Sequence, residues 1–249
     1  MSYAPPPEDS SGSASSGQTW QAAPQYSPDR RWYWDGVRWQ PVVATGPLWS
    51  RPYASPEGRA SAAVALVGLV VAGAGLFLVA DGLLLIAALA APASILDTIA
   101  AGLYLFAAWA SAAGLVAAAV AVPMWMHRTF RNLPALGETN LGWSPAWAVG
   151  GWFIPIGNLV IPYLVARELW ARTVGTAAPG WPLLPVWWAT VIAAVLLQRQ
   201  IDLASGLGAD VIGLVNDAVR LLAGVLLIVI VRTVTRVQRE RHARVDAGA

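Results

Sequence analysis

Cysteine and lysine are both missing from this 249-residue sequence, and only two histidines are present. Without cysteine, the chain can form no disulfide, no thiolate nucleophile and no thiolate metal site. His127 and His242 alone offer little for metal binding or proton transfer, so the sequence predicts no catalytic residues, no metal site and no cofactor. Charged residues are scarce, at 12% against 57% apolar residues, which is about half the charged share of soluble domains. The composition therefore indicates a membrane protein.

Polar and apolar residues are unevenly distributed along the chain. Residues 1–59 are rich in Pro, Ser and Gly, residues 60–235 are mostly apolar, and residues 232–244 are basic. This division predicts a soluble tail joined to a membrane core. The predicted parts are a disordered Pro/Ser/Gly-rich tail at 1–28, a Trp-rich β-hairpin at 29–42, a linker at 43–59, a multi-helix membrane domain at 60–243 and a flexible C-terminus at 244–249.

The amino-terminal tail is predicted to be disordered, because it has too few apolar groups to offset the entropy of ordering. It also lacks the basic and apolar regions of a secretory signal. Pro5, Pro6 and Pro7 favour a short polyproline II stretch. Two interpretations of this tail stay open: a solvated tether, or a ligand for a proline-binding module.

A Trp-rich β-hairpin is predicted after the tail, because Asp35-Gly36 favours a two-residue type I′ turn between β-prone runs. This turn places Trp32 opposite Trp39 and puts Trp34 on the same face. A lone hairpin is marginally stable in water, so this one requires a third strand, a partner or the bilayer surface. The three tryptophans are therefore candidates for binding a partner.

The same region resembles a known motif. Residues 27–36, SPDRRWYWDG, with Trp39 and Pro41 are similar to the short Trp-rich, WW-like motif found near the start of many actinobacterial membrane proteins. True WW domains have three strands and bind proline-rich peptides in an aromatic groove. A third strand is not evident in the sequence, so a structural or interfacial Trp cluster stays open as the alternative.

Four apolar runs predict membrane-spanning helices. They cover residues 61–80, 99–126, 182–198 and 211–231. Asp81 is expected to cap the outer end of the first span. The apolar run at 83–96 either extends that helix or lies at the membrane surface. Gly114 lies between alanines at four-residue spacing and predicts close helix packing.

A fifth apolar run, residues 147–166, is interrupted by Pro155, Asn158, Pro162 and three glycines. If all five runs cross, eight arginines lie inside and seven outside; if this run dips in and returns, 14 lie inside and only Arg199 outside. The positive-inside rule favours the second arrangement. We therefore predict an all-α protein of the cell membrane with four transmembrane helices, one broken or re-entrant helix and cytoplasmic termini. Five transmembrane helices are the alternative.

The apolar core carries an ordered series of motifs. They are HRTFRNL at 127–133, a block at 143–163 that contains WFIP at 152–155, RELW at 167–170, Trp187-Trp188, and a closing Arg-rich stretch. This series resembles an actinobacterial membrane family known only as domain of unknown function 4328, over roughly residues 60–243. The resemblance implies an integral membrane protein of several helices, and it implies no activity.

Polar groups within the apolar runs form a candidate functional site. In a helix, Pro155 and Pro162 would each free a backbone carbonyl at membrane depth, beside the amide of Asn158. Asp217 and Arg220 lie three residues apart and can pair on one helix face. These groups form either an ion or solute site, or a packed kink with a snorkelling structural pair. Asn158 is expected to point into the bundle, near the last helix. The candidate residues are Trp152, Pro155, Asn158, Pro162, Asp217 and Arg220.

Basic residues follow the last span. Arg232, Arg236 and Arg239 lie at helical spacing, and such a stripe either contacts anionic lipid headgroups or anchors the topology. No nucleic-acid partner is predicted, because no folded domain presents the patch.

These features together predict a non-enzymatic interaction or scaffold protein of the cell membrane. Its expected partners are the lipid bilayer and a protein bound through the amino-terminal tail. The alternative is a small channel or transporter built around Asn158, Asp217 and Arg220. The sequence does not indicate an oligomeric state.

Overall fold

The chain divides into two compact units, Met1–Thr45 and Gly46–Ala249. The structure is a computed structural model that describes residues 25–26, 32–34, 39–41, 52–90, 95–175, 182–201, 203 and 207–247. The disordered tail predicted at residues 1–28 lies outside the described residues except for Gln25 and Tyr26, which form a β-strand and so differ from that prediction.

The first unit contains a three-stranded antiparallel sheet in the order β1-β2-β3. Its strands are β1 (Gln25–Tyr26), β2 (Trp32–Trp34) and β3 (Trp39–Pro41). Strand β1, which the sequence did not reveal, pairs with β2 and gives the hairpin its third strand.

The register of the hairpin differs from the prediction. Trp34 lies opposite Trp39, and Trp32 lies opposite Pro41, so the predicted pairing of Trp32 with Trp39 is wrong. The paired residues Trp34 and Trp39 are five positions apart in the sequence, whereas a two-residue type I′ turn would pair residues three positions apart. Asp35-Gly36 itself lies outside the described residues.

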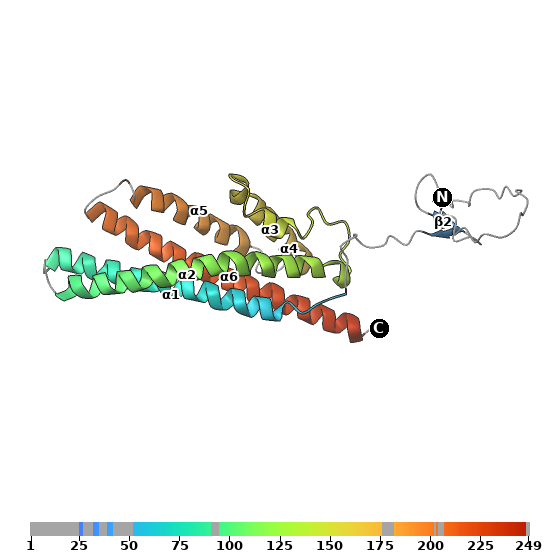
Figure 1. Ribbon diagram of the computed structural model, residues 1–249, viewed down its shortest axis with the longest axis horizontal. Coiled ribbons are helices and arrows are strands. Elements are labelled where there is room, and N and C mark those ends of the chain that lie inside the picture. The colour runs from blue at the N-terminus through green and yellow to red at the C-terminus, as the bar shows by residue number, and fades with distance from the viewer. Residues whose placement is uncertain are drawn as a thin grey trace, which may run out of the picture. The chain divides into compact units, whose positions relative to one another are not determined.

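The second unit is helical (Figure 1). Its α-helices are α1 (Glu57–Ala90), α2 (Ile95–Asn132), α3 (Trp147–Gly150), α4 (Ile161–Thr173), α5 (Leu183–Ile201) and α6 (Leu207–Ala247). Two 3₁₀ turns, η1 (Pro134–Leu136) and η2 (Gly157–Leu159), lie between them.

Four of these helices, α1, α2, α5 and α6, are long and apolar enough to span a membrane. This confirms the predicted number of spanning helices. Helices α1, α2 and α6 contain 34, 38 and 41 residues, so each is longer than the roughly 20 residues that cross a hydrocarbon core of about 30 Å. The alternative of five transmembrane helices has no counterpart, because residues 147–166 do not form one helix.

Helix α1 continues through Asp81, so the expectation that Asp81 caps its outer end is wrong. The side chain is only 5% exposed. Its carboxyl group interacts with Tyr104 of α2 and Asp217 of α6. The carboxyl group therefore lies inside the bundle beside groups of two other helices, within a helix that continues to Ala90.

Close packing joins the long helices. Helix α1 packs against both α2 and α6, and α5 packs against α6. A Cβ atom on Gly114 of α2 would lie only 3.0 Å from Cγ2 of Val70 on α1, which confirms the predicted close packing there. Further along α2, buried Trp125 donates its indole N–H to Thr235 of α6 at 3.0 Å. A buried indole requires such a partner.

Residues 147–166 break in the middle, as the sequence predicts. Helix α3 ends at Gly150, and α4 begins only at Ile161. Between them, Ile156 has a φ of 65°, which is rare for a β-branched residue and marks a tight change of direction. A Cβ atom on Gly151 would lie 2.5 Å from Cγ2 of Ile161, so glycine permits the close approach of the two halves.

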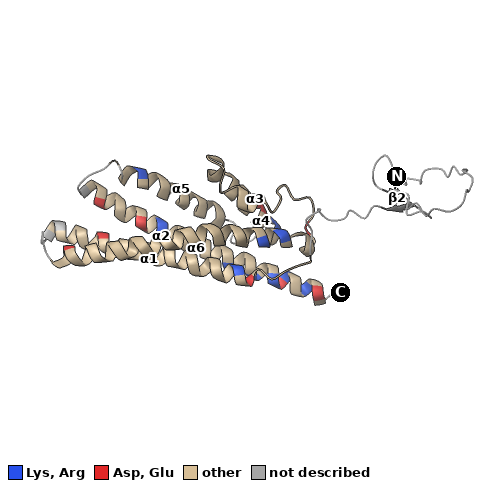
Figure 2. Ribbon diagram, in the orientation of Figure 1, with Lys and Arg blue, Asp and Glu red and all other residues tan. Residues whose placement is uncertain are grey.

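The start of α1 and the end of α6 lie at the same end of the helical unit (Figure 1). Glu57 of α1 forms an ion pair with Arg239 of α6 at 2.9 Å. Tyr53, just before α1, stacks on His242 of α6 with ring centroids 3.8 Å apart. Most of the arginines gather here (Figure 2), and we call this the basic end.

Candidate functional site

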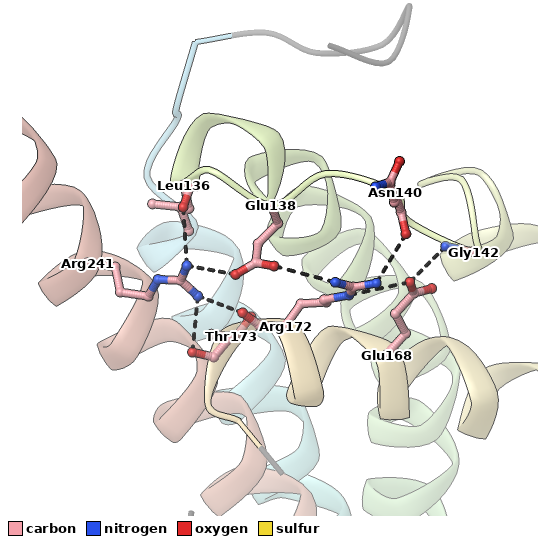
Figure 3. Close-up of polar contacts among 8 residues, drawn as sticks. All are labelled: Leu136, Glu138, Asn140, Gly142, Glu168, Arg172, Thr173 and Arg241. Carbon is pink, nitrogen blue, oxygen red and sulfur yellow. Dashed lines mark hydrogen bonds and ion pairs between the residues drawn. The ribbon is translucent and has the colours of Figure 1, made fainter. Parts of the chain in front are cut away.

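A polar network at the basic end connects α4, α6 and the loop after α2 (Figure 3). Glu138 accepts a hydrogen bond from Arg241 of α6 at 2.8 Å and lies 3.8 Å from Arg172 of α4. Arg241 also donates to the backbone carbonyls of Leu136, Arg172 and Thr173. The last two are terminal carbonyls of α4, which lack partners inside their own helix. One guanidinium therefore caps α4 and holds it against α6.

Glu168 of α4 fixes the chain that leads into the broken segment. Its carboxylate accepts backbone N–H groups from Gly142 at 2.8 Å and Trp143 at 3.1 Å. One turn later, Arg172 donates to the carbonyl of Asn140 at 3.1 Å. Residues 140–143 precede the break, whereas Glu168 and Arg172 follow it. Both ends of the broken segment therefore lie at the basic end.

A second buried network lies beside the first. Gln238 of α6 is fully buried and donates to the carbonyl of Thr129, near the end of α2, at 2.8 Å. Its side-chain oxygen accepts a bond from Asn132 at 3.3 Å. Asn132 in turn exchanges two hydrogen bonds with the backbone of Ala54. The side-chain amides of Asn132 and Gln238 thus join the segment before α1, the end of α2 and helix α6, which are distant in sequence.

Burial raises the pKa of the Tyr53 hydroxyl, which lies at the basic end before α1. The carboxylate of Glu57 raises this pKa further, and Arg239 opposes the effect. Tyr53 therefore stays a neutral phenol at neutral pH, stacked on His242.

A cavity of about 600 Å³ lies between α2 and α5, with α1 and α6 also contributing to its lining. Trp152, Trp187 and Trp188 line it toward the basic end. Gln198, Arg199, Asn216 and Arg220 line it toward the opposite end. Most of the remaining wall is aliphatic, so the cavity has an apolar body and a polar end.

The structure brings two of the candidate site residues, Trp152 and Arg220, into the lining of this cavity. Arg220 lies 3.7 Å from Asp217, so the predicted pair forms. Asp217 is buried against Asp81 of α1. The indole nitrogen of Trp152 is buried without a hydrogen-bond partner among the described residues.

The structure does not place Asn158 with that pair. Its side chain is exposed, so the expectation that Asn158 points into the bundle is wrong. The physical reason lies in the backbone. The segment turns at Pro155 instead of continuing as a helix, and the N–H of Asn158 bonds to the carbonyl of Ile154 at 2.8 Å. Pro155 is also exposed, and Pro162 is buried in the first turn of α4.

The arginine stripe of α6 is partly occupied by contacts within the protein. Arg239 pairs with Glu57, and Arg236 lies 3.9 Å from Glu240 on the same helix. Arg232 is exposed. Only part of the stripe is therefore open to lipid headgroups.

Sequence reasoning missed Glu138, Glu168 and Gln238. Glu168 belongs to a family motif, and that was the one signal available for it. In the part of the chain that the structure describes, no group of three or more histidine or carboxylate side chains gathers to hold a metal ion.

Comparison with known proteins gives one family. A family model described as "Domain of unknown function (DUF4328)" matches residues 91–236, which is more than half of the chain. Neither a curated protein nor a solved structure matches. The match includes the broken segment, the cavity-lining parts of α5 and α6 and most of the network residues. This chain belongs to the family described as domain of unknown function (DUF4328).

Proposed function

We propose that this protein is a non-enzymatic interaction protein of the cell membrane, with its basic end and both termini on the cytoplasmic side. One observation carries the proposal. The contacts of Glu168 and Arg172 return the broken segment to the end where α1 begins and α6 finishes. If four helices cross the membrane and the broken segment returns, all loops and termini at the basic end face the same side of the membrane.

The distribution of arginine supports this orientation. Most of the described arginines lie at the basic end (Figure 2), whereas Arg199 and Arg220 line the cavity at its opposite end. Loops rich in arginine favour the cytoplasmic side of a membrane. The ion pair between Glu138 and Arg241 also joins the segments of the basic end, so this surface is a rigid one at the membrane boundary.

The amino-terminal unit is the part that would bind a partner. Three antiparallel strands agree with the strand number of WW domains, which supports the likeness of this segment to them. Trp32, Trp34 and Trp39 lie in its paired strands β2 and β3. A proline-rich peptide is the class of ligand that such a sheet would take.

Affinity capture from detergent tests this proposal. The full chain is compared with a deletion of residues 1–42 and with the double variant Trp34→Ala/Trp39→Ala. We expect a captured partner to be lost in both and retained by the control Trp49→Ala, which changes a tryptophan of the linker that follows residues 1–42. An unchanged set of captured proteins after deletion of residues 1–42 would contradict a binding role for the tail.

The alternative is a small channel or transporter, and one feature favours it. The cavity reaches Arg220 and Asn216 within the helical unit. Solute flux in proteoliposomes that disappears in both Asn216→Leu and Arg220→Leu, two changes in the cavity lining, would support this alternative and contradict the interaction proposal.

A further inference from the structure

The cavity between α2 and α5 opens to the surface of the helical unit. Leu115 of α2 and Val195 of α5 both line it, yet they are 58% and 51% exposed. In a spanning bundle, a surface of this kind faces lipid. A lipid chain can therefore enter sideways between the two helices.

The polar end of the cavity contains an unsatisfied acceptor. Asn216 is only 2% exposed and donates its amide N–H to Gln198 at 3.2 Å. Its side-chain oxygen has no hydrogen-bond partner among the described residues. A buried polar atom without a partner is costly, which points to a donor supplied by a bound molecule.

Two cations lie at the same end. Arg199 is exposed and makes no ion pair or hydrogen bond within the described part of the chain. Arg220 is partly exposed and lies 3.7 Å from Asp217. The guanidinium of Arg220 thus has a long contact with a carboxylate, whereas the guanidinium of Arg199 is open to an anion.

We propose that this cavity is a binding site for one anionic phospholipid. The phosphate lies between Arg199 and Arg220, a headgroup hydroxyl donates to the open oxygen of Asn216, and an acyl chain runs along the aliphatic wall toward Trp188. This site goes beyond the proposed function and does not depend on the amino-terminal tail.

The dimensions of the cavity fit such a ligand. Arg199 lies eleven positions after Trp188 on α5, which corresponds to about 16 Å along the helix. One leaflet occupies about half of the roughly 30 Å hydrocarbon core, so a single acyl chain matches this length. A soluble anion would leave the apolar wall unused. Phosphatidylcholine also has a phosphate, but its choline places a positive charge beside the two arginines and has no hydroxyl to donate to Asn216.

Native mass spectrometry of the full chain in mild detergent tests the site. The protein is incubated with dioleoyl phosphatidylglycerol or with dioleoyl phosphatidylcholine. We expect the phosphatidylglycerol to be retained preferentially, with one molecule per chain. Arg199→Gln should weaken its retention roughly five-fold, as expected for one arginine near an anionic headgroup. The control Arg244→Gln removes an exposed arginine at the basic end that lies outside the stripe of Arg232, Arg236 and Arg239, and it should leave retention unchanged.

A steric variant tests the acyl-chain wall separately. Ala194 lines the cavity, whereas Ala189 on the same helix is exposed and does not. Ala194→Trp should fill the cavity and abolish retention of phosphatidylglycerol, and Ala189→Trp should not. The proposal would be overturned if the unaltered chain retained the two lipids equally, or if Arg199→Gln or Ala194→Trp left retention unchanged. A lipid-free dimer that closes the cavity would also overturn it.

Discussion

Replacement of Arg241 by methionine is expected to lower the free energy of unfolding by about 2 kcal/mol. Methionine keeps most of the apolar stem and removes the guanidinium. Glu138 then loses its closest cation, and the terminal carbonyls of α4 lose their donor. The side chains of Arg241 and Glu138 are 25% and 20% exposed, so the effect should be smaller than for a fully buried pair. Thermal unfolding of the full chain in detergent measures it.

Two further variants separate the geometry of Arg241 from its charge. Arg241→Lys keeps the charge but cannot reach several acceptors at once, so we expect an intermediate loss of stability. Among the described residues, Arg244 bonds only to a carbonyl of its own helix, and Arg244→Met should change stability little. If Arg241→Met proves as mild as Arg244→Met, the basic-end network does not hold α4 against α6.

The second large effect is expected for Gln238→Leu, at about 2–3 kcal/mol. Gln238 is fully buried, and leucine has a similar size but no polar atoms. The carbonyl of Thr129 would lose its donor, and the amide of Asn132 would lose one acceptor. Asn132 also holds Ala54, so the segment before α1 should loosen as well.

Limited proteolysis near residue 54, together with thermal unfolding, measures both consequences of Gln238→Leu. Gln200 on α5 is exposed, so Gln200→Leu serves as the matched control and should stay within about 0.5 kcal/mol of the unaltered chain. Equal behaviour of the two variants would show that the buried amide pair contributes little.

Sequence patterns predicted the number of spanning helices, because each apolar run has the length that a bilayer requires. The prolines and glycines of residues 147–166 predicted the break, because proline interrupts helical hydrogen bonds whatever the tertiary structure. Helix ends were harder to predict. Asp81 looked like a cap because its partners, Tyr104 and Asp217, come from helices that only tertiary packing brings together.

The candidate site was predicted only in part for the same reason. Asp217 and Arg220 are neighbours on one helix, so their spacing sufficed to predict the pair. The cavity is formed by side chains from four helices and the broken segment, and no local pattern encodes it. The placement of Asn158 depends on the positive φ of Ile156, which nothing in the sequence required.

Cysteine labelling tests the central claim, the return of the broken segment to the basic end, most directly. The chain has no native cysteine, and Thr139 and Arg167 are exposed positions before and after the break. Leu203, which is 83% exposed between α5 and α6, supplies the control. A membrane-impermeant thiol reagent on intact cells should label Leu203→Cys and spare both Thr139→Cys and Arg167→Cys, which should react only in inverted vesicles. Labelling of Thr139→Cys and Arg167→Cys from opposite sides would show that the segment crosses, and it would contradict the account.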